Sequence, residues 1–191
     1  MTYEVRCGFM TFDKIIANRR SIRKFKKDPL KKEHIEAILD AGNKAPSAKN
    51  LQHWRFHVYQ GEAKDNLVKF ILKEFDKISS EPSVHKYARY SFQIMDEAPV
   101  AILVYTAQVM EHPARPDIQS VSAAIQNMLL KAQELGIGSL WICDVLYIDE
   151  TIMNHVGAEM PLLATISLGY ANESPASRTR LTVDDVTTWY E

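Results

Sequence analysis

Apolar residues recur along this chain with two different spacings, and each spacing predicts a different kind of element. Helical spacing predicts helices at residues 11–18, 31–43, around 67–71 and at about 118–135. The last of these is the clearest, because its apolar positions keep the helical period throughout and Gly136 follows directly. Glycine readily adopts the left-handed conformation that ends many helices. We therefore expect Gly136 to cap this helix.

Short apolar runs predict four strands, at residues 54–59, 100–106, 139–142 and 164–168. The last three runs are almost continuously apolar, as expected for strands that helices cover on both faces. Segments 79–83, 111–117 and 172–177 combine Pro with Ser, Asn or Asp and predict surface loops, none long enough to separate two domains. Residues 1–191 are therefore expected to form one α+β domain, with a sheet between layers of helices.

The overall charge argues against some classes of partner. The chain of 191 residues holds 23 Lys and Arg against 24 Asp and Glu, a formal net charge of -1, so no global field favours nucleic acid or an anionic membrane. Cys7 and Cys143 form no C-x-x-C pair, which fits a reducing cytosol. Residues 1–10 lack the apolar core of a signal peptide, and the longest apolar run, 98–107, is about half a membrane span. We expect a soluble, cytoplasmic protein.

One basic segment is a candidate for binding a phosphate group. Residues 19–27 hold six basic side chains in nine positions, among them Arg19, Arg20 and Arg23, with Ser21 between them. Guanidinium groups and a neighbouring hydroxyl supply both charge and directed donors to a phosphate. The alternative is a solvated basic face or a weak nucleic-acid surface, and the near-neutral total charge argues against the nucleic-acid version.

A second basic pair lies near the C-terminus. Arg178 and Arg180 have the i, i+2 spacing that places both side chains on one side of an extended segment. By itself this pair is weak evidence, because ordinary surface arginines are the default interpretation.

A loop of small and polar residues leads into the first predicted strand. It includes Pro46, Ser47, Ala48 and Asn50. Small side chains allow the backbone to approach a flat ligand, and Ser and Asn offer directed hydrogen bonds. The alternative is an ordinary helix-to-strand loop with Trp54 and Phe56 in the core, and for these two aromatics that alternative is favoured.

Gly136 and Gly138 form a G-x-G pattern that is not a dinucleotide fingerprint. That fingerprint requires a strand, then the glycines, then a helix, whereas here the helix comes first and the strand follows. We expect the two glycines to cap the helix and turn the chain.

Motifs for other chemistries are missing from the sequence, which contains neither H-E-x-x-H nor G-x-S-x-G. His53 and His57 are four residues apart in the first predicted strand region and would share a face, but no third ligand accompanies them. We expect neither a metal site nor a catalytic side chain.

Together these segments resemble the nitroreductase family. The family shares the order R-R-S-x-R-x-F, A-P-S-A-x-N-x-Q-x-W, a helix ending E-L-G-x-G before an apolar strand, and a basic pair near the end. D-E-A-P-V at 96–100 and L-G-Y at 168–170 extend the resemblance, which covers about residues 11–190. It implies a three-layer α+β fold with a central, mainly antiparallel sheet flanked by helices, in an intertwined homodimer.

The resemblance also implies FMN, held non-covalently at the homodimer interface by three groups of residues. Its phosphate would meet Arg19, Arg20, Ser21, Arg178 and Arg180, and the pyrimidine edge of the flavin would lie near Arg23. The partner subunit would contribute Pro46, Ser47, Ala48 and Asn50. The backbone of Ile142, Cys143 and Asp144 would lie near flavin N5.

The sequence departs from the family pattern at two motif positions. His53 stands where many members have Pro, and Cys143 stands where Gly is common. The connection between residues 75 and 98 is also too short for the large lid of some members.

The implied activity is reduction of nitroaromatic, quinone or related acceptors by NADH or NADPH, in two half-reactions on the flavin. The cofactor carries the chemistry, and Arg23 gives electrostatic support. One alternative is a specialised member, such as a reductive dehalogenase or a flavin-consuming enzyme. Another is a non-catalytic protein that stores or delivers flavin.

Overall fold

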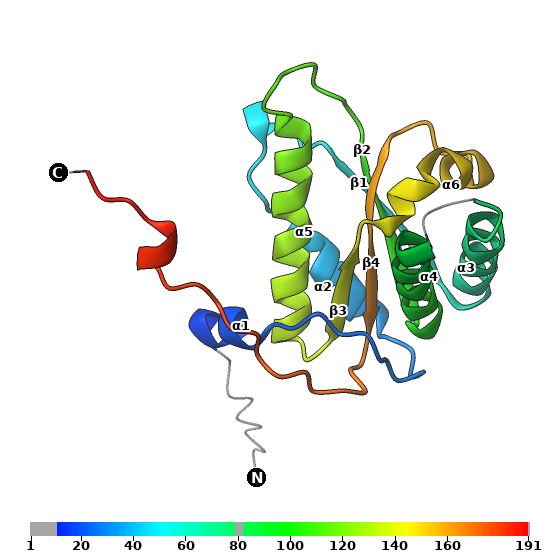
Figure 1. Cartoon of the computed structure of the whole chain (residues 1–191), viewed down its shortest axis with the longest axis horizontal. Coiled ribbons are helices and arrows are strands. Elements are labelled where there is room, and N and C mark those ends of the chain that lie inside the picture. The colour runs from blue at the N-terminus through cyan, green and yellow to red at the C-terminus, as the bar shows by residue number, and fades with distance from the viewer. Residues whose placement is uncertain (1–10, 79–81, 191) are drawn as a thin grey trace, which may run out of the picture.

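A four-stranded sheet forms the centre of the molecule (Figure 1). The computed structural model describes residues 11–78 and 82–190, with the backbone alone for 82–85, so the expectations on Cys7 and residues 1–10 concern residues outside this range. The strands are β1 (Trp54–Gln60), β2 (Val100–Thr106), β3 (Gly138–Ile142) and β4 (Leu162–Gly169). They lie in the order β1-β2-β4-β3 with every neighbouring pair antiparallel. The four predicted strands and the antiparallel sheet are confirmed.

Helices cover both faces of the sheet and give three layers (Figure 1). One face carries α2 (Lys32–Asn43) and α5 (Pro116–Glu134), and the other carries α3 (Gly61–Phe75), α4 (Pro82–Glu97) and α6 (Asp149–Val156). The short helix α1 (Phe12–Asn18) packs beside α5. All four predicted helices are present. Within the described part of the chain, no helix has both the length and the apolarity needed to span a bilayer.

The central strand β2 separates two parts of the core. Because side chains alternate along a strand, Leu103 and Tyr105 pack among α3 and α4, whereas Ile102 and Val104 pack against α2 and α5. Every residue of β2 is buried. The apolar run in the sequence is therefore continuous rather than alternating.

The long helix α5 ends as expected at a glycine. Gly136 has a φ of 70°, its N–H donates to Gln133 O at 3.1 Å, and Ile137 N–H donates to Ala132 O at 2.8 Å. These two bonds satisfy carbonyls that the last helical turn leaves open. The prediction for Gly136 is confirmed.

Two other glycines allow close packing rather than turns. A Cβ on Gly138 would lie 3.0 Å from Ile22 Cγ1, and one on Gly42 would lie 2.7 Å from Met128 Cγ. The expectation that Gly138 turns the chain is wrong, because this residue begins β3. Gly42 lets α2 approach α5 closely.

The structure contains two helices that the apolar pattern does not predict. The loop predicted at 79–83 is wrong at its end, because Pro82 is the first residue of α4; residues 79–81 lie outside the described range. Phe92 and Met95 belong to a buried stripe on α4, but exposed Tyr87 and Tyr90 interrupt it in the sequence. The other helix, α6, has eight residues, too few to give a clear period.

The remaining loop predictions hold with one change. The loop predicted at 111–117 ends earlier, because Pro116 is the first residue of α5, a position that proline favours. Residues 172–177 form neither helix nor strand, as expected.

Candidate functional site

The basic segment after α1 runs beside the edge strand β3. Ile22 N–H donates to Ser139 O at 3.0 Å, and Lys26 N–H donates to Tyr170 O at 2.8 Å. Ile22 and Phe25 are buried in the core. These anchors fix the backbone, so that Arg23 lies on the side of the segment away from the core.

The C-terminal segment returns to the same place after β4. Glu173 Oε1 accepts hydrogen bonds from the N–H groups of Arg23, at 2.5 Å, and of Lys24, at 3.2 Å. An antiparallel bridge pairs Phe25 with Ala171. Glu173 therefore holds the start of the C-terminal segment against the basic segment.

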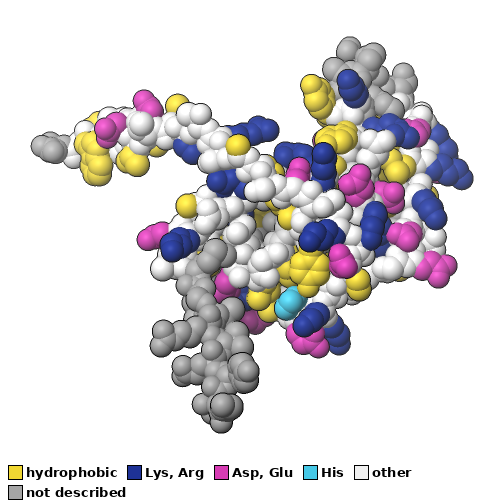
Figure 2. Space-filling view, turned by 90° about the horizontal axis from the view of Figure 1, so that it is seen from below, with side chains coloured by type: hydrophobic (Ala, Val, Ile, Leu, Met, Phe, Trp, Pro, Cys, Tyr) yellow, Lys and Arg dark blue, Asp and Glu magenta, His cyan; other side chains and the backbone are white. Residues whose placement is uncertain are grey.

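The two basic segments line one cavity of about 660 Å³, which we call the arginine cavity. Its lining consists of Ile16, Ala17, Arg19, Arg20, Ser21, Arg23, Gln126, Pro175, Ala176, Ser177, Arg178 and Arg180. This lining contains five arginines and no carboxylate. In the view from below, Lys and Arg side chains gather where the projecting C-terminal segment meets the body of the molecule (Figure 2).

The charge of the arginine cavity has no ion-pair partner in the described part of the chain. Among the described residues, no carboxylate forms an ion pair with any of its five guanidinium groups. Arg20 Nη1 donates to Ala17 O at 2.6 Å and to Arg19 O at 2.9 Å, but Arg20 Nε is buried and has no described partner. Arg23 Nη1 donates to Ser21 O at 3.2 Å. Clustered guanidiniums without counter-charges suit an anionic ligand.

Sequence reasoning missed part of this cavity. Gln126 reaches it from the middle of α5, and Ile16 and Ala17 reach it from α1. Gln126 is exposed and directly follows buried Ile125, so it lies off the buried stripe of the helix. A polar residue on the exposed side of a helix is common, so the sequence around Gln126 does not indicate that it lines a ligand site.

The predicted loop at 46–50 lies elsewhere in the same chain. It includes the 3-10 turn η1 (Ala48–Asn50), at the N-terminal end of α5, whereas α1 lies beside the other half of that helix (Figure 1). Pro46, Ser47, Ala48 and Asn50 are not part of the arginine cavity lining. A single chain therefore does not bring this loop and the basic segments together.

Ile142, Cys143 and Asp144 lie at the far end of β3. Ile142 is buried and Cys143 is exposed. Although the residue keeps solvent contact, desolvation by the protein around it and the Asp144 carboxylate raise the pKa of the Cys143 thiol above its ordinary value. Because β3 passes Ser21 at Ser139, Ile142 is about 10 Å along the strand from the basic segment. An elongated ligand could reach from one to the other.

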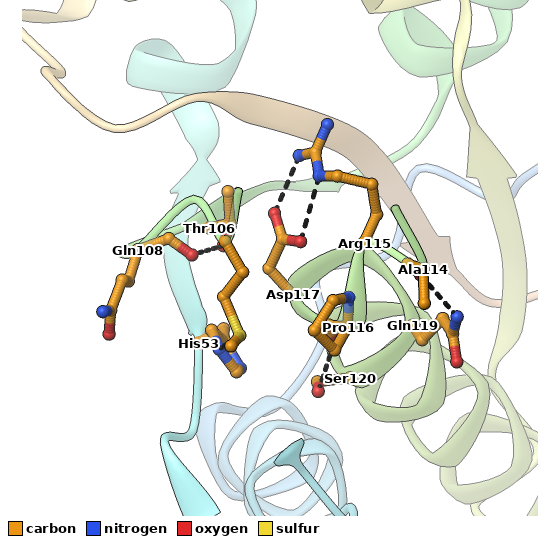
Figure 3. Close-up of polar contacts among 10 residues, drawn as sticks. His53, Thr106, Gln108, Ala114, Arg115, Pro116, Asp117, Gln119 and Ser120 are labelled. Carbon is orange, nitrogen blue, oxygen red and sulfur yellow. Dashed lines mark hydrogen bonds and ion pairs between the residues drawn. The ribbon is translucent and has the colours of Figure 1, made fainter. Parts of the chain in front are cut away.

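The two histidines do not form a joint site. His53 (Figure 3) precedes β1 and is buried. Its Nε2 lies 3.3 Å from Met110 Sδ, whereas the His57 ring lies 4.6 Å from that of Tyr105. The two rings therefore contact different neighbours, and His53 lies outside the strand that contains His57. Trp54 is in the core as expected, and its Nε1 donates to Asn43 Oδ1 at 3.0 Å.

These features define a three-layer α+β protein with a cationic cavity beside the edge of its sheet. The model of the nitroreductase family matches residues 16–170. The chain belongs to this family, as its motifs suggest.

Named relatives and a solved structure agree with this assignment. The chain is similar to YfhC of Bacillus subtilis, provisionally named an NAD(P)H nitroreductase, with 28% identity and 90% of both chains covered. It is also similar to a 5,6-dimethylbenzimidazole synthase of Rhodospirillum rubrum, with 26% identity and 84% of this chain and 82% of the relative covered. Iodotyrosine deiodinase of Thermotoga neapolitana is 24% identical, with 86% and 90% covered.

The fold is similar to the crystal structure of a Desulfovibrio desulfuricans protein, provisionally named a nitroreductase, in complex with FMN. The identity is 26% and the TM-score 0.78, with 95% of this chain and 98% of the other covered. The mixed helix and antiparallel sheet architecture that the motifs imply is confirmed.

Proposed function

We propose that the protein is an FMN-dependent oxidoreductase that uses NADH or NADPH to reduce nitroaromatic, quinone or related acceptors. The observation that carries the proposal is the arginine cavity, with five arginines and no carboxylate around about 660 Å³. Similarity to a structure in complex with FMN and to a relative named an NAD(P)H nitroreductase supports the choice of cofactor and reductant.

The residues of the cavity fit the phosphate group of FMN. Arg20 Nε is a buried donor without a described partner, and buried donors are rarely left unsatisfied. A phosphate oxygen would satisfy it and neutralise part of the surrounding charge. We assign the phosphate to Arg19, Arg20 and Ser21, joined by Arg178 and Arg180.

When bound, FMN supplies the hydride and electron chemistry. The chain orients the cofactor and sets the field around it. Arg23 lines the cavity and is held by its bond to Ser21 O. We assign it to the pyrimidine edge of the flavin, where its charge would favour the reduced cofactor. The backbone at Ile142, Cys143 and Asp144 is assigned to the neighbourhood of flavin N5.

A homodimer would complete the site. The C-terminal segment projects from the body of the molecule (Figure 1) and leaves Leu181, Val186 and Trp189 exposed by 73%, 67% and 76%. Large apolar side chains on a projecting segment are typical of residues that become buried in an interface. We propose that this segment packs on a second copy, and that residues 46–50 meet the FMN held in the arginine cavity of the partner subunit.

A specialised reaction is the second candidate. It is favoured by the similarity to an iodotyrosine deiodinase and to a 5,6-dimethylbenzimidazole synthase. Their names suggest reductive dehalogenation and a synthetic reaction, and no described feature of the arginine cavity separates these from nitroreduction, because all three would need the same phosphate anchor.

Anaerobic turnover of the FMN-loaded protein tests these candidates. NADH and NADPH are each supplied with nitrofurazone, with a quinone, or with iodotyrosine, and both reductant oxidation and flavin content are followed. We expect turnover with nitrofurazone or the quinone and parallel double-reciprocal plots. Turnover with iodotyrosine alone, or loss of the flavin itself when the reduced protein is exposed to air, would favour the second candidate. Retained FMN without any NAD(P)H oxidation would mean a flavin-binding protein and would refute the proposal.

A further inference from the structure

The segment that carries Ser47, Ala48 and Asn50 contains an unusual run of backbone conformations. Lys49, Asn50 and Gln52 have positive φ values of 53°, 55° and 48°. Residues other than glycine adopt this region rarely and keep it only where the surrounding structure enforces it. We call residues 47–52 the strained turn. Specific hydrogen bonds must therefore hold it in this conformation.

Hydrogen bonds within the strained turn close it on itself. Asn50 N–H donates to Ser47 O at 3.0 Å, and Leu51 N–H donates to Ala48 O at 3.1 Å. Gln52 N–H donates to Ser47 Oγ at 3.0 Å, which leaves the Ser47 hydroxyl hydrogen available to a ligand. These bonds fix the shape of the turn but not its position relative to the helices.

Ser120 supplies the link between the strained turn and α5. Ala48 N–H donates to Ser120 Oγ at 3.1 Å. The Ser120 hydroxyl donates in turn to Pro116 O at 2.6 Å (Figure 3), so its hydrogen is engaged and its oxygen accepts. The Ser120 side chain is buried, and water therefore competes poorly for either bond.

An ion pair fixes the helical turn from which Ser120 projects. The Asp117 side chain is fully buried and accepts from Arg115 Nε at 3.1 Å and from Arg115 Nη2 at 2.8 Å (Figure 3). Arg115 itself has a positive φ of 42°. The two-point contact holds the first turn of α5 in one position, and Ser120 with it.

The same helix also lines the arginine cavity. Gln126 follows Ser120 by six residues, about 9 Å along an α-helix. One rigid element therefore carries a wall of the phosphate cavity and the support of the strained turn. Any shift of the turn relative to α5 changes the place from which the turn meets the FMN of the partner subunit, while Gln126 stays in the wall of the chain's own cavity.

We propose that Ser120 is a positioning residue for flavin binding. Its hydroxyl holds Ala48 N–H, and with it the strained turn, in the place from which Ser47 and Asn50 meet FMN in the partner subunit. This inference rests on the proposed function and goes beyond it, because Ser120 is not assigned to touch the cofactor. It also predicts that Ser120 acts through one backbone donor.

The test removes each side of this hydrogen bond. Ser120→Ala removes the acceptor. Ala48→Pro removes the donor and suits the chain, because Ser47 before it is extended, with ψ 149°. Ser120→Thr keeps the hydroxyl, and Ser122→Ala is the control on the same helix, since no hydrogen bond of the Ser122 side chain is described. The readouts are the FMN dissociation constant of the dimer and hydrogen exchange of the Ala48 amide.

We expect FMN to bind about three- to tenfold more weakly to Ser120→Ala, as for loss of one hydrogen bond, with Ser120→Thr and Ser122→Ala within about twofold of the wild type. The Ala48 amide hydrogen should exchange faster than in the wild type in Ser120→Ala, but not in Ser120→Thr or Ser122→Ala. The double variant Ala48→Pro/Ser120→Ala should bind FMN no more weakly than Ala48→Pro does, because both changes break the same bond.

Three results would overturn the inference. These are unchanged FMN affinity in Ser120→Ala, an equal loss in Ser122→Ala, or additive losses in the double variant. Each presupposes that the wild-type protein binds FMN. A wild-type protein that binds no FMN would refute the proposed function itself, so the two failures are distinguishable.

Discussion

The backbone N–H of Arg23 donates to Glu173 Oε1 at 2.5 Å, and this bond joins the basic segment to the C-terminal segment. Lys24 N–H donates to the same oxygen. Glu173 thus bonds to the backbone and to no arginine side chain, and it holds the start of the segment whose Arg178 and Arg180 line the same cavity as Arg20. The position of the cavity depends on this carboxylate.

Glu173→Ala should therefore weaken FMN binding although Glu173 is not assigned to the cofactor. Loss of a contact equivalent to one hydrogen bond should raise the dissociation constant roughly three- to tenfold. Fluorescence titration measures it, with Glu159→Ala as the exposed control. Equal affinities of the two variants would mean that the C-terminal segment is held by other contacts.

Arg20→Ala should have a larger effect, because it would remove a contact that we assign directly to the phosphate. Hydrogen bonds to charged groups contribute about 1.5–3 kcal/mol, or roughly ten- to a hundredfold in affinity. The matched control is Lys26→Ala, a basic residue of the same segment outside the cavity lining. A dissociation constant that changes equally in both variants would point to general charge rather than to a phosphate site.

Arg23→Leu should lower the two-electron midpoint potential of the bound flavin and leave the cofactor largely bound. A charge at the pyrimidine edge favours the reduced form, and only such a differential effect shifts the potential. A contact of about 1.5–3 kcal/mol corresponds to roughly 30–65 mV. Potentiometric titration against Lys24→Leu decides the matter. A shift below about 10 mV with full occupancy would assign the flavin edge to another residue.

Acid should destabilise the fold partly through Asp117. The Arg115 guanidinium lowers the pKa of this carboxyl below its ordinary value of 3.8. The folded state therefore favours the ionised carboxylate. The contribution of Asp117 ionisation to the free energy of unfolding is complete above the ordinary pKa of 3.8 and is lost as the pH falls through the lower pKa of the folded state.

Asp117→Asn should therefore lower the free energy of unfolding at pH 7, and its deficit should shrink below about pH 4. Urea unfolding at several pH values measures this, with exposed Asp28→Asn as the control. A deficit independent of pH would show that the ion pair contributes nothing that titrates.

Sequence pattern predicted the sheet well because burial on both faces makes strands such as β2 continuously apolar. It failed at α4, where exposed Tyr87 and Tyr90 interrupt the buried stripe of Phe92 and Met95. Local pattern reports which face is buried only when the other face is polar.

Some residues of the candidate site could likewise be predicted from the sequence, and others could not. Composition singled out the segment of Arg20, and Arg178 gained a role only through the family resemblance. Their meeting in one cavity depends on the pairing of Phe25 with Ala171, which no local pattern encodes. The sequence did not indicate Ser120, because a serine near the start of a helix is common and its bond to Ala48 is long-range.

The visible absorbance spectrum of the freshly purified protein shows whether the arginine cavity binds FMN. We predict a yellow protein with roughly one FMN per chain, or a colourless one that takes up FMN stoichiometrically at micromolar concentration. A protein that is colourless and still fails to bind added FMN under these conditions would contradict the account.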